Sequence, residues 1–426
     1  MNPIPIEDIK KHAGKSVALR GWIYRTRESK GMVFVVLRDV TGIVQCVIKE
    51  GVKGFKDAQK ALMESSISVK GKVSKDKRAP GGFEIHVEDF ALIGPAEDFP
   101  IKEQQSTELL LDNRHLWIRS RKLTNVFKIR SEVFRAIHDF FHERGFFEIQ
   151  SPSITSSACE GGSTLFEVNY FGKKAYLTQS WQLYAEAMIA GLENIYCIAP
   201  SFRAEKSRTR RHLAEYWHAE AEMAWLDHED NMKLQEDLIT FILKRVVERR
   251  SKELKQVGRD PKELEKMYGP YKRVTYKKAL ELLKKDGVKM KWGEDFGADE
   301  ERVLTKHFKK PFFVVEFPKE AKAFYMKENP KDKKTYLCND MLAPEGYGEI
   351  IGASEREMDV KKLIERIKKE GGNVKDYEWY LDIRKYGSIP HSGFGLGIER
   401  IIMWICKLDH IRDTIAFPRV MNRIYP

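Results

Sequence analysis

Two charged side chains that could bind a phosphate stand at the end of an apolar segment. Arg203 and Glu205 lie in the sequence F-R-A-E (202–205), and the basic loop K-S-R-T-R-R-H (206–212) follows them. Alternation along a strand would place both side chains on one face. The guanidinium could hold a phosphate through paired hydrogen bonds, while the carboxylate could accept from an amine. A charge run alone usually indicates a solvated loop, so this interpretation depends on other motifs.

A glycine-rich segment near the end of the chain could form a second part of such a site. Gly393, Gly395 and Gly397 alternate in the sequence G-F-G-L-G-I-E-R, which ends at Arg400. Three glycines on one strand face would leave it bare, so that a flat ring could lie there. Arg400 would begin a helix, whose dipole favours anions. The alternative is a strand whose glycines lack side chains so that another element can pack closely against it. The spacing differs from that of the Rossmann fingerprint.

Two carboxylates offer hard oxygen ligands. Asp340 and Glu349 are separated by an apolar stretch that contains glycine. Such ligands suit a magnesium ion that bridges nucleotide phosphates. Taken alone, they would more commonly be ordinary surface acids.

The first part of the chain has the pattern of a small β barrel. Five β-like segments occur before residue 97, with a short polar helix between the third and the fourth. This order is typical of an OB fold, although another small barrel would fit the same pattern. The segments are residues 17–24, 32–39, 43–50, 67–74 and 83–94.

The rest of the chain predicts a second, α+β domain over residues 121–426, after a linker over 98–120. It begins with an amphipathic helix that Gly145 ends, followed by the strand-like F-F-E-I-Q-S-P (146–152). An antiparallel sheet with flanking helices is expected, with a charged helical insertion at about 228–310. The other expected elements are a helix at 182–191, strands at 195–205, 213–225 and 348–357, a hairpin of 312–318 with 322–327, and a glycine-rich strand that enters an apolar helix at 393–413.

Composition limits the function classes. The chain has 426 residues and a formal net charge of +12, which favours a polyanionic partner, although a solvated Lys/Glu-rich surface is equally compatible with it. The five cysteines are scattered without a C-x-x-C pair, so neither a disulfide framework nor a structural zinc site built on them is expected. No apolar run is long enough to span a bilayer, and residues 1–12 lack a signal-peptide core. These features predict a cytoplasmic protein without a membrane partner.

Together the motifs resemble the three signature motifs of the class II aminoacyl-tRNA synthetases. The first is the long helix with the strand ending at Pro152, the second is residues 202–223, and the third is residues 393–404. The expected OB domain ahead of them is similar to that of the aspartyl, asparaginyl and lysyl subgroup. The resemblance covers nearly the whole chain. It implies ATP and Mg²⁺ as cofactors, a tRNA partner and a homodimer.

The resemblance implies roles at matching positions. Arg203 would hold the α-phosphate and the amino-acid carboxylate, Glu205 would contact the adenine end, and Arg400 would bind the γ-phosphate. Asp340 and Glu349 would hold the metal. The implied ATP-binding set is Arg203, Glu205, Arg211, His212, Leu213, Tyr216, Glu349, Gly397, Ile398, Glu399 and Arg400, and the implied amino-acid set is Glu160, Gln179, Gln182, Arg203, Glu220 and Arg356. In the OB domain, Phe34 would stack on an anticodon base, with Arg27 and Gln45 nearby.

The same comparison bears on which amino acid is activated. Aspartyl relatives have a lysine after the segment T-Q-S-x-Q-L-Y, whereas Ala185 stands there in this chain. Bound aspartate would therefore lack a charge partner. Glu220 could accept from a carboxamide NH, and Arg356 could donate to its oxygen. The pattern predicts activation of asparagine and its transfer to asparagine tRNA. An aspartyl enzyme, the asparagine synthetase paralogue that lacks an anticodon domain, and a non-catalytic tRNA-binding homologue remain as alternatives.

Overall fold

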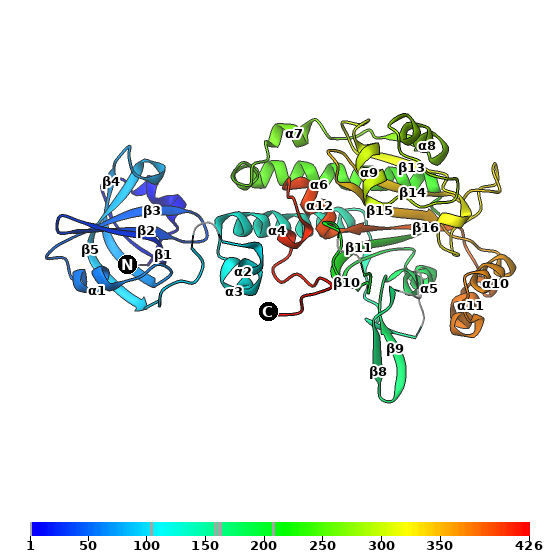
Figure 1. Ribbon diagram of the computed structural model, residues 1–426, viewed down its shortest axis with the longest axis horizontal. Coiled ribbons are helices and arrows are strands. Elements are labelled where there is room, and N and C mark those ends of the chain that lie inside the picture. The colour runs from blue at the N-terminus through cyan, green and yellow to red at the C-terminus, as the bar shows by residue number, and fades with distance from the viewer. Residues whose placement is uncertain (1, 103–104, 157–158, 160–163, 207–208) are drawn as a thin grey trace. The chain divides into compact units, whose positions relative to one another are not determined.

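The computed structural model describes residues 2–102, 105–156, 159, 164–206 and 209–426. Contacts within the chain divide it into a first unit, Met1–Leu110, and a second unit, Leu111–Pro426 (Figure 1). Of the helices in the described ranges, none combines the length and apolar character needed to cross a bilayer.

The first unit is a closed five-stranded barrel, which confirms the OB-fold prediction. Its strands follow the order β1-β2-β3-β5-β4, and the parallel pairing of β3 with β5 closes it. Apolar residues alternate along β2 and fill the interior, for example Val33, Val35 and Leu37. The elements are β1 (Ser16–Ser29), β2 (Met32–Arg38), β3 (Ile43–Lys49), α1 (Phe55–Lys60), β4 (Ser66–Lys75) and β5 (Phe83–Gly94).

The second unit is built on an eight-stranded sheet of order β12-β13-β14-β15-β16-β11-β10-β6. All neighbouring pairs are antiparallel except β12 with β13 and β10 with β6. The strands are β6 (Phe147–Glu148), β10 (Asn194–Phe202), β11 (Glu215–Ala224), β12 (Lys272–Thr275), β13 (Phe312–Val315), β14 (Cys338–Ala343), β15 (Gly348–Glu355) and β16 (His391–Gly397). Three shorter strands form a separate sheet: β7 (Ile154–Thr155), β9 (Lys173–Leu177) and β8 (Glu167–Tyr170).

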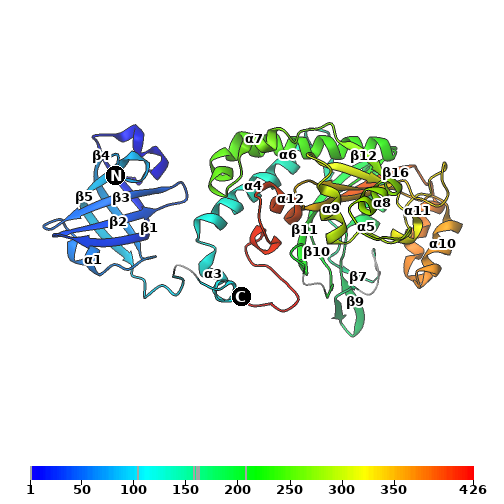
Figure 2. The same ribbon diagram turned by 45° about the horizontal axis from the view of Figure 1, so that its top comes forward.

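One face of the large sheet is covered by α4 (Arg121–His142), α6 (His228–Gln256) and α12 (Ile398–Ile405). Ser120 caps α4 by accepting a hydrogen bond from the Leu123 backbone N–H at 3.4 Å. The apolar face of α4 packs on α6 and on alternate residues of β11, including Ala219, Ala221 and Met223. Figure 2 shows these helices as a layer along the sheet. The side chains between them on β11 therefore point to the opposite face.

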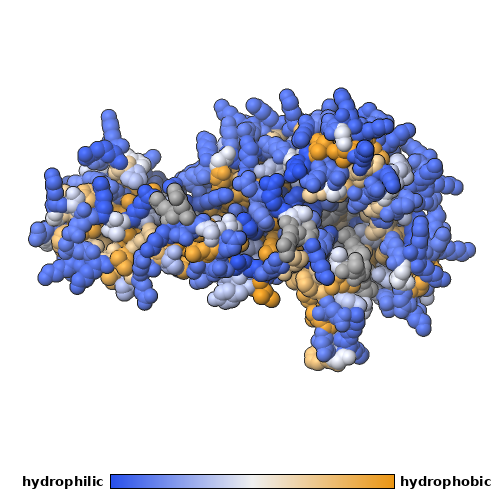
Figure 3. Space-filling view, in the orientation of Figure 1, coloured by the Kyte–Doolittle hydropathy of each residue, from blue (hydrophilic) through white to orange (hydrophobic). Residues whose placement is uncertain are grey.

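The opposite face is partly covered by α5 (Gln182–Leu192), which packs against β10 and β11. The remaining helices flank these layers: α7 (Pro261–Glu265), α8 (Tyr276–Lys285), α9 (Ala298–Thr305), α10 (Val360–Lys369) and α11 (Glu378–Lys385). The visible surface is mostly hydrophilic, with hydrophobic residues interspersed near the β8–β9 hairpin (Figure 3).

Three parts of the second unit differ from the expectations. The segment 312–318 does not pair with 322–327; β13 pairs with β12 and β14, because Phe312 and Val314 are needed in the core and Lys322 turns inward. The expected insertion at 228–310 contributes α6 to the central core. The expected linker at 98–120 contains α2 (Thr107–Asp112) and α3 (Arg114–Trp117). Arg114 is anchored by donating to the carbonyl oxygens of Arg412, Ile415 and Ala416 at 2.8–3.0 Å.

Candidate active site

A row of aligned residues crosses the open face of the large sheet. Asp340 on β14 pairs with Gly352 on β15, Gly352 pairs with Gly395 on β16, and Gly395 pairs with Glu220 on β11. Residues that lie opposite one another in neighbouring strands project to the same side. The two carboxylates therefore stand at the ends of a trough whose floor is two glycines wide.

A second row of aligned residues lies beside the first, and charged side chains occupy the space above it. Ser354, Gly393 and Glu222 are aligned on β15, β16 and β11. A Cβ on Gly393 would lie 1.9 Å from Glu222 Oε2 and 2.6 Å from a terminal nitrogen of Arg356. The expectation of a bare face along all three alternating glycines is therefore wrong at Gly393, where the missing side chain makes room for an ion pair.

The trough opens into a cavity of about 860 Å³. Its walls include residues from both ends of the row and from the segment before α5; those used below are Ser180, Trp181, Gln182, Arg203, His218, Glu220, Glu222, Lys322, Asp340, Glu349, Gly352, Arg356 and Gly395. A smaller cavity of about 70 Å³ adjoins it and shares Arg203, His218, Glu349 and Gly395. This arrangement suits a long ligand that occupies both spaces.

The smaller cavity brings together nearly all of the implied ATP-binding residues. It is lined by Arg203, Glu205, Arg211, His212, Leu213, Tyr216, Glu349, Gly397, Glu399 and Arg400. Ile398 is the exception: its side chain is fully buried in the core beneath the sheet, so only its backbone faces this region. Glu399 is bound by Arg130 at 2.6 Å and by the Trp217 backbone N–H at 2.8 Å, which fixes the start of α12.

Arg203 and Glu205 lie just beyond the end of β10 at Phe202, so strand alternation does not place them, but their side chains approach each other. Arg203 Nη1 lies 3.7 Å from Glu205 Oε1, and its guanidinium is 5.8 Å from the centre of the Tyr216 ring. His212 Nε2 lies 3.5 Å from the other Glu205 oxygen. Burial, followed by the charge of Arg400, lowers the pKa of His212. A neutral ring beside cationic side chains is suited to close over a nucleotide.

Two arginines converge on Glu349. Arg400 donates to its carboxylate at 2.6 Å, and Arg211 donates to its backbone oxygen at 3.3 Å. Arg211 is held by Glu301 of α9 at 2.7 Å, and Glu301 also accepts from the Glu349 backbone N–H at 2.6 Å. Sequence reasoning missed Glu301. Its only signal was an acid in the first turn of a charged helix, which does not distinguish it from the solvated acids nearby.

Asp340 and Glu349 approach each other over Gly352, because a Cβ on Gly352 would lie 3.9 Å from Asp340 Oδ1 and 3.3 Å from Glu349 Oε1. Lys322, which the sequence did not single out, donates to Asp340 at 2.7 Å. Burial and the charge of Glu349 raise the pKa of Asp340 to about 8 despite Lys322, whereas Arg400 and Lys322 outweigh burial and lower the pKa of Glu349 to about 2. Two crowded carboxylate oxygens over a glycine fit a hard divalent cation.

The other end of the trough is organised by Glu220. It accepts from Ser180 Oγ at 2.5 Å and from the Trp181 backbone N–H at 2.7 Å. His218 Nδ1 lies 3.8 Å from Glu220, and burial with the nearby charges of Arg203 and Arg400 lowers the pKa of His218 to about 3. The neutral His218 does not compensate the Glu220 charge, so this end of the cavity presents a carboxylate acceptor.

Arg356 and Glu222 form a bidentate pair beside Glu220, with both hydrogen bonds at 2.9 Å. Arg356 also donates to Ser354 Oγ at 2.8 Å, and Glu222 outweighs burial to raise the pKa of Arg356. Both residues line the cavity. Glu222 was missed by the sequence analysis, although it lies two residues after Glu220 and so on the same strand face.

Behind this wall lies a buried network centred on Glu186. It accepts from Tyr380 at 2.8 Å, from Gln182 Nε2 at 3.0 Å and from Arg384, and His391 Nε2 lies 3.0 Å away. Gln182 lines the cavity and is thus fixed from behind, whereas Gln179 is buried and donates to Thr164 at 2.8 Å. Glu160 lies outside the described residues.

Ala185 does not face the cavity. It is fully buried in an apolar cluster with Trp181, Ile189, Ile195 and Cys197. Trp181, itself 2% exposed, forms cavity wall instead. Position 185 thus carries an apolar side chain in the core, and the cavity wall beside it is formed by Trp181.

The expected tRNA-binding residues occupy one surface of the first unit. Arg27 and Phe34 are cross-strand partners, and the Arg27 guanidinium lies 4.6 Å from the Phe34 ring centre. Gln45 Nε2 donates to Glu84 at 2.9 Å. Partly exposed Phe34 offers a ring face on a β surface, as base stacking requires.

Two family models and several known proteins match the chain. Residues 106–421 match the model of tRNA synthetases class II (D, K and N), and residues 17–93 match that of the OB-fold nucleic acid binding domain. An asparagine–tRNA ligase from Pyrococcus abyssi is 52% identical, over 99% of this chain and 98% of that one. The structure of asparaginyl-tRNA synthetase from Pyrococcus horikoshii complexed with asparaginyl-adenylate is similar over 100% of both chains, with 49% identity and a TM-score of 0.97. The Entamoeba histolytica asparaginyl-tRNA synthetase structure covers both chains fully at 34% identity and a TM-score of 0.90.

Proposed function

The chain belongs to the asparaginyl-tRNA synthetases of class II, and from this membership we propose that it activates L-asparagine with ATP and transfers it to asparagine tRNA. The observation that carries the proposal is the pair of adjoining cavities, one lined by phosphate-binding arginines and the other by a carboxylate and an arginine suited to a carboxamide. Amino-acid-dependent exchange of pyrophosphate into ATP tests it.

The reaction needs no side-chain nucleophile. The asparagine carboxylate attacks the α-phosphorus of ATP, the bond to the β-phosphate bridging oxygen breaks, and pyrophosphate leaves with that electron pair. Arg203, which lines both cavities, would bridge the attacking carboxylate and the α-phosphate. Arg400 would hold the γ-phosphate. Catalysis then comes from fixed geometry and from cations placed where charge develops. The 3′-hydroxyl of the terminal adenosine of the tRNA then attacks the carbonyl carbon of the mixed anhydride and loses its proton, and AMP leaves with the electron pair of the broken acyl–phosphate bond.

The carboxylates at the far end of the trough would hold magnesium. Asp340 and Glu349 converge over Gly352, and each is paired with a cationic side chain, Lys322 or Arg400. A divalent ion would neutralise phosphate charge there. The ion pair with Arg400 keeps Glu349 ionised, whereas the raised pKa of Asp340 means that binding of the ion would release a proton from that carboxyl.

Selection of asparagine follows from the opposite end of the trough. Glu220, whose oxygens are already held by Ser180 and Trp181, would accept from the carboxamide NH₂. Glu222 and Ser354 use three of the five Arg356 N–H groups among the described residues, so the remaining groups could donate to the carboxamide oxygen. Aspartate would place a carboxylate against Glu220. Like charge in a buried site is a strong form of rejection.

The partners follow from the same proposal. The OB unit would read the anticodon through Phe34, Arg27 and Gln45. A symmetric dimer would cover exposed apolar residues around β6 and β7, where Phe147 is 54% and Ile154 44% exposed. Translation in the cytosol would consume the product.

One feature argues against each of the three alternatives. An aspartyl enzyme would need a cation that is free to neutralise the substrate carboxylate, whereas Arg356, the cation beside Glu220, is already paired with Glu222. A non-catalytic homologue would not need to retain Arg203, Glu205, Glu349 and Arg400 together in one cavity. The asparagine synthetase paralogue would lack the OB barrel that residues 17–93 form here.

A further inference from the structure

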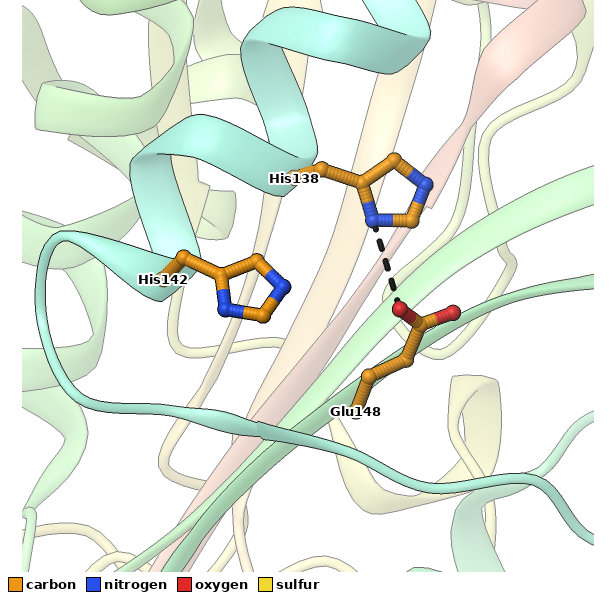
Figure 4. Close-up of side chains that lie close together, drawn as sticks. All are labelled: His138, His142 and Glu148. Carbon is orange, nitrogen blue, oxygen red and sulfur yellow. Dashed lines mark ion pairs between the residues drawn. The ribbon is translucent and has the colours of Figure 1, made fainter.

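A cluster of side chains outside the active site has the composition of a transition-metal site. His138 and His142 lie four residues apart in the last turns of α4, and Glu148 lies on β6, after the turn at Gly145. One ligand atom from each of the three lies within 4.8 Å of the other two. Figure 4 shows both imidazole rings leaving α4 on the side that faces Glu148.

The spacing of these residues has a physical basis. Residues four apart project from the same side of a helix, and two histidines so placed can bind one ion. Two histidines with a glutamate make up a common zinc ligand set. In a tetrahedral site with zinc–ligand distances of about 2.1 Å, ligand atoms lie roughly 3.4 Å apart. His138 Nδ1 lies 3.5 Å from Glu148 Oε2, which agrees with that separation.

A supporting residue orients the cluster from behind. The Tyr196 hydroxyl, on the adjacent strand β10, is 2.9 Å from His138 Nδ1 and 3.4 Å from Glu148 Oε2. When Nδ1 binds a metal, the hydroxyl can donate to Glu148 alone. Such outer hydrogen bonds to ligating carboxylates are typical of metal sites.

Among the described residues, a second group of three possible metal ligands is less suited to bind a cation. Glu186, Glu222 and His391 are fully buried, and both carboxylates are already paired with guanidinium groups of Arg384 and Arg356. A divalent cation there would be placed beside two fixed positive charges. At the α4–β6 cluster, the only ion-pair partner of Glu148 among the described residues is His138, so no guanidinium opposes a cation there.

We propose that His138, His142 and Glu148 form a binding site for a zinc-class divalent ion, with a water molecule in the remaining coordination position. The ion would tie the end of α4 to β6, the edge strand of the large sheet. This site is separate from the carboxylate pair proposed for magnesium, because imidazole ligands select zinc-class ions and carboxylates alone select hard ones.

The test uses the full chain stripped of metal with a chelator and then titrated with Co²⁺ in excess Mg²⁺, which occupies hard-oxygen sites. The expected result is one equivalent bound per chain, with a tetrahedral visible absorption spectrum that one equivalent of Zn²⁺ abolishes. His142→Gln should weaken binding by more than tenfold. Because His142 is exposed, this variant should fold, and circular dichroism checks that it does.

His86→Gln is the matched control, because His86 faces Glu84 at 2.8 Å in the first unit but forms only a two-residue pair. It should leave Co²⁺ binding unchanged. The melting temperature of the wild type should rise with Zn²⁺ while that of His142→Gln should not. Absence of a tetrahedral spectrum in the wild type, or equal binding by His142→Gln and the wild type, would overturn the proposal.

Discussion

Glu220 and Asp340 lie in one cross-strand row of the large sheet, with only Gly395 and Gly352 between them. Glu220 is fixed by Ser180 and Trp181, and Asp340 is fixed by Lys322. Because both glycines lack a side chain, the floor between the carboxylates stays open. The row thus places the amino-acid end and the metal end of the proposed reaction on opposite sides of the space where ATP would react.

The glycine floor gives the first prediction. A Cβ on Gly395 would make only ordinary contacts with Glu220, at 3.6 Å, so Gly395→Ala should fold. The methyl group would nevertheless occupy the trough and displace substrate, and the KM values for ATP and asparagine should rise by roughly tenfold or more in pyrophosphate exchange. Gly191→Ala is the control, since a Cβ there meets nothing within 4 Å. Unchanged kinetics for Gly395→Ala would show that substrate does not lie over the row.

The acceptor at the amino-acid end gives the second prediction. Glu220→Gln removes the charge that accepts from the carboxamide and repels aspartate. The kcat/KM for asparagine should fall by roughly 10–100-fold, while the preference for asparagine over aspartate narrows. Steady-state exchange with each amino acid measures both quantities. Glu281→Gln, on the exposed helix α8, controls for loss of a carboxylate. If the ratio of kcat/KM for asparagine to kcat/KM for aspartate does not change, Glu220 does not recognise the carboxamide.

The OB surface gives the third prediction. Phe34→Ala removes the ring that Arg27 covers at 4.6 Å. Loss of one stacked base should weaken tRNA charging by roughly 10–100-fold, and pyrophosphate exchange should remain intact because no tRNA takes part. Phe34→Tyr, which keeps the ring, should charge tRNA normally. Equal loss of exchange and charging in Phe34→Ala would contradict a role confined to tRNA binding.

The buried network behind the amino-acid pocket gives a prediction about stability. Glu186→Gln would leave Arg384 without its anionic partner, and the free energy of unfolding should fall by about 3 kcal/mol near pH 7. Asp382→Asn, which removes one member of an exposed pair with Lys385, should change it little. Denaturant unfolding measures both variants. A wild-type value for Glu186→Gln would show that the network does not support the fold.

The loss of stability in Glu186→Gln should depend on pH. Burial alone would raise the pKa of Glu186, but Arg384 and His391 outweigh burial and hold it well below 4.5 in the folded state. Below pH 4.5 the unfolded carboxyl therefore binds a proton that the folded one does not. The stability difference between wild type and Glu186→Gln should be complete above pH 4.5 and shrink as the pH falls below it. A difference that grows on acidification would refute the assigned direction.

Motif spacing predicted much of this site because strand alternation is a local property. Gly395 and Gly397 of β16 face one side for that reason, and the five-strand barrel followed from its alternating apolar segments, whereas Arg203 and Glu205 lie beyond the end of β10. Partners that come from distant segments could not be predicted in this way. Glu301 and Lys322 reach the site from irregular or charged regions, where their residue types resemble the solvated surface around them.

Contacts with distant segments also explain why the observed fold differs from the expected one. The segment 322–327 has the composition of a strand, but Lys322 binds Asp340, and Phe324 and Tyr325 enter the second core cluster. The charged character of residues 228–310 concealed the apolar face of α6, which packs on α4. The role of Ala185 in choosing the amino acid stays a prediction, because its side chain is buried in an apolar cluster and Trp181, four positions earlier, lines the cavity.

Exchange of pyrophosphate into ATP, measured with asparagine and with aspartate side by side, tests the central claim most directly. Exchange that depends on asparagine and is absent with aspartate is the result that Glu220, Arg356 and the apolar position at Ala185 predict. Exchange that depends on aspartate would contradict the assignment of this pocket to a carboxamide.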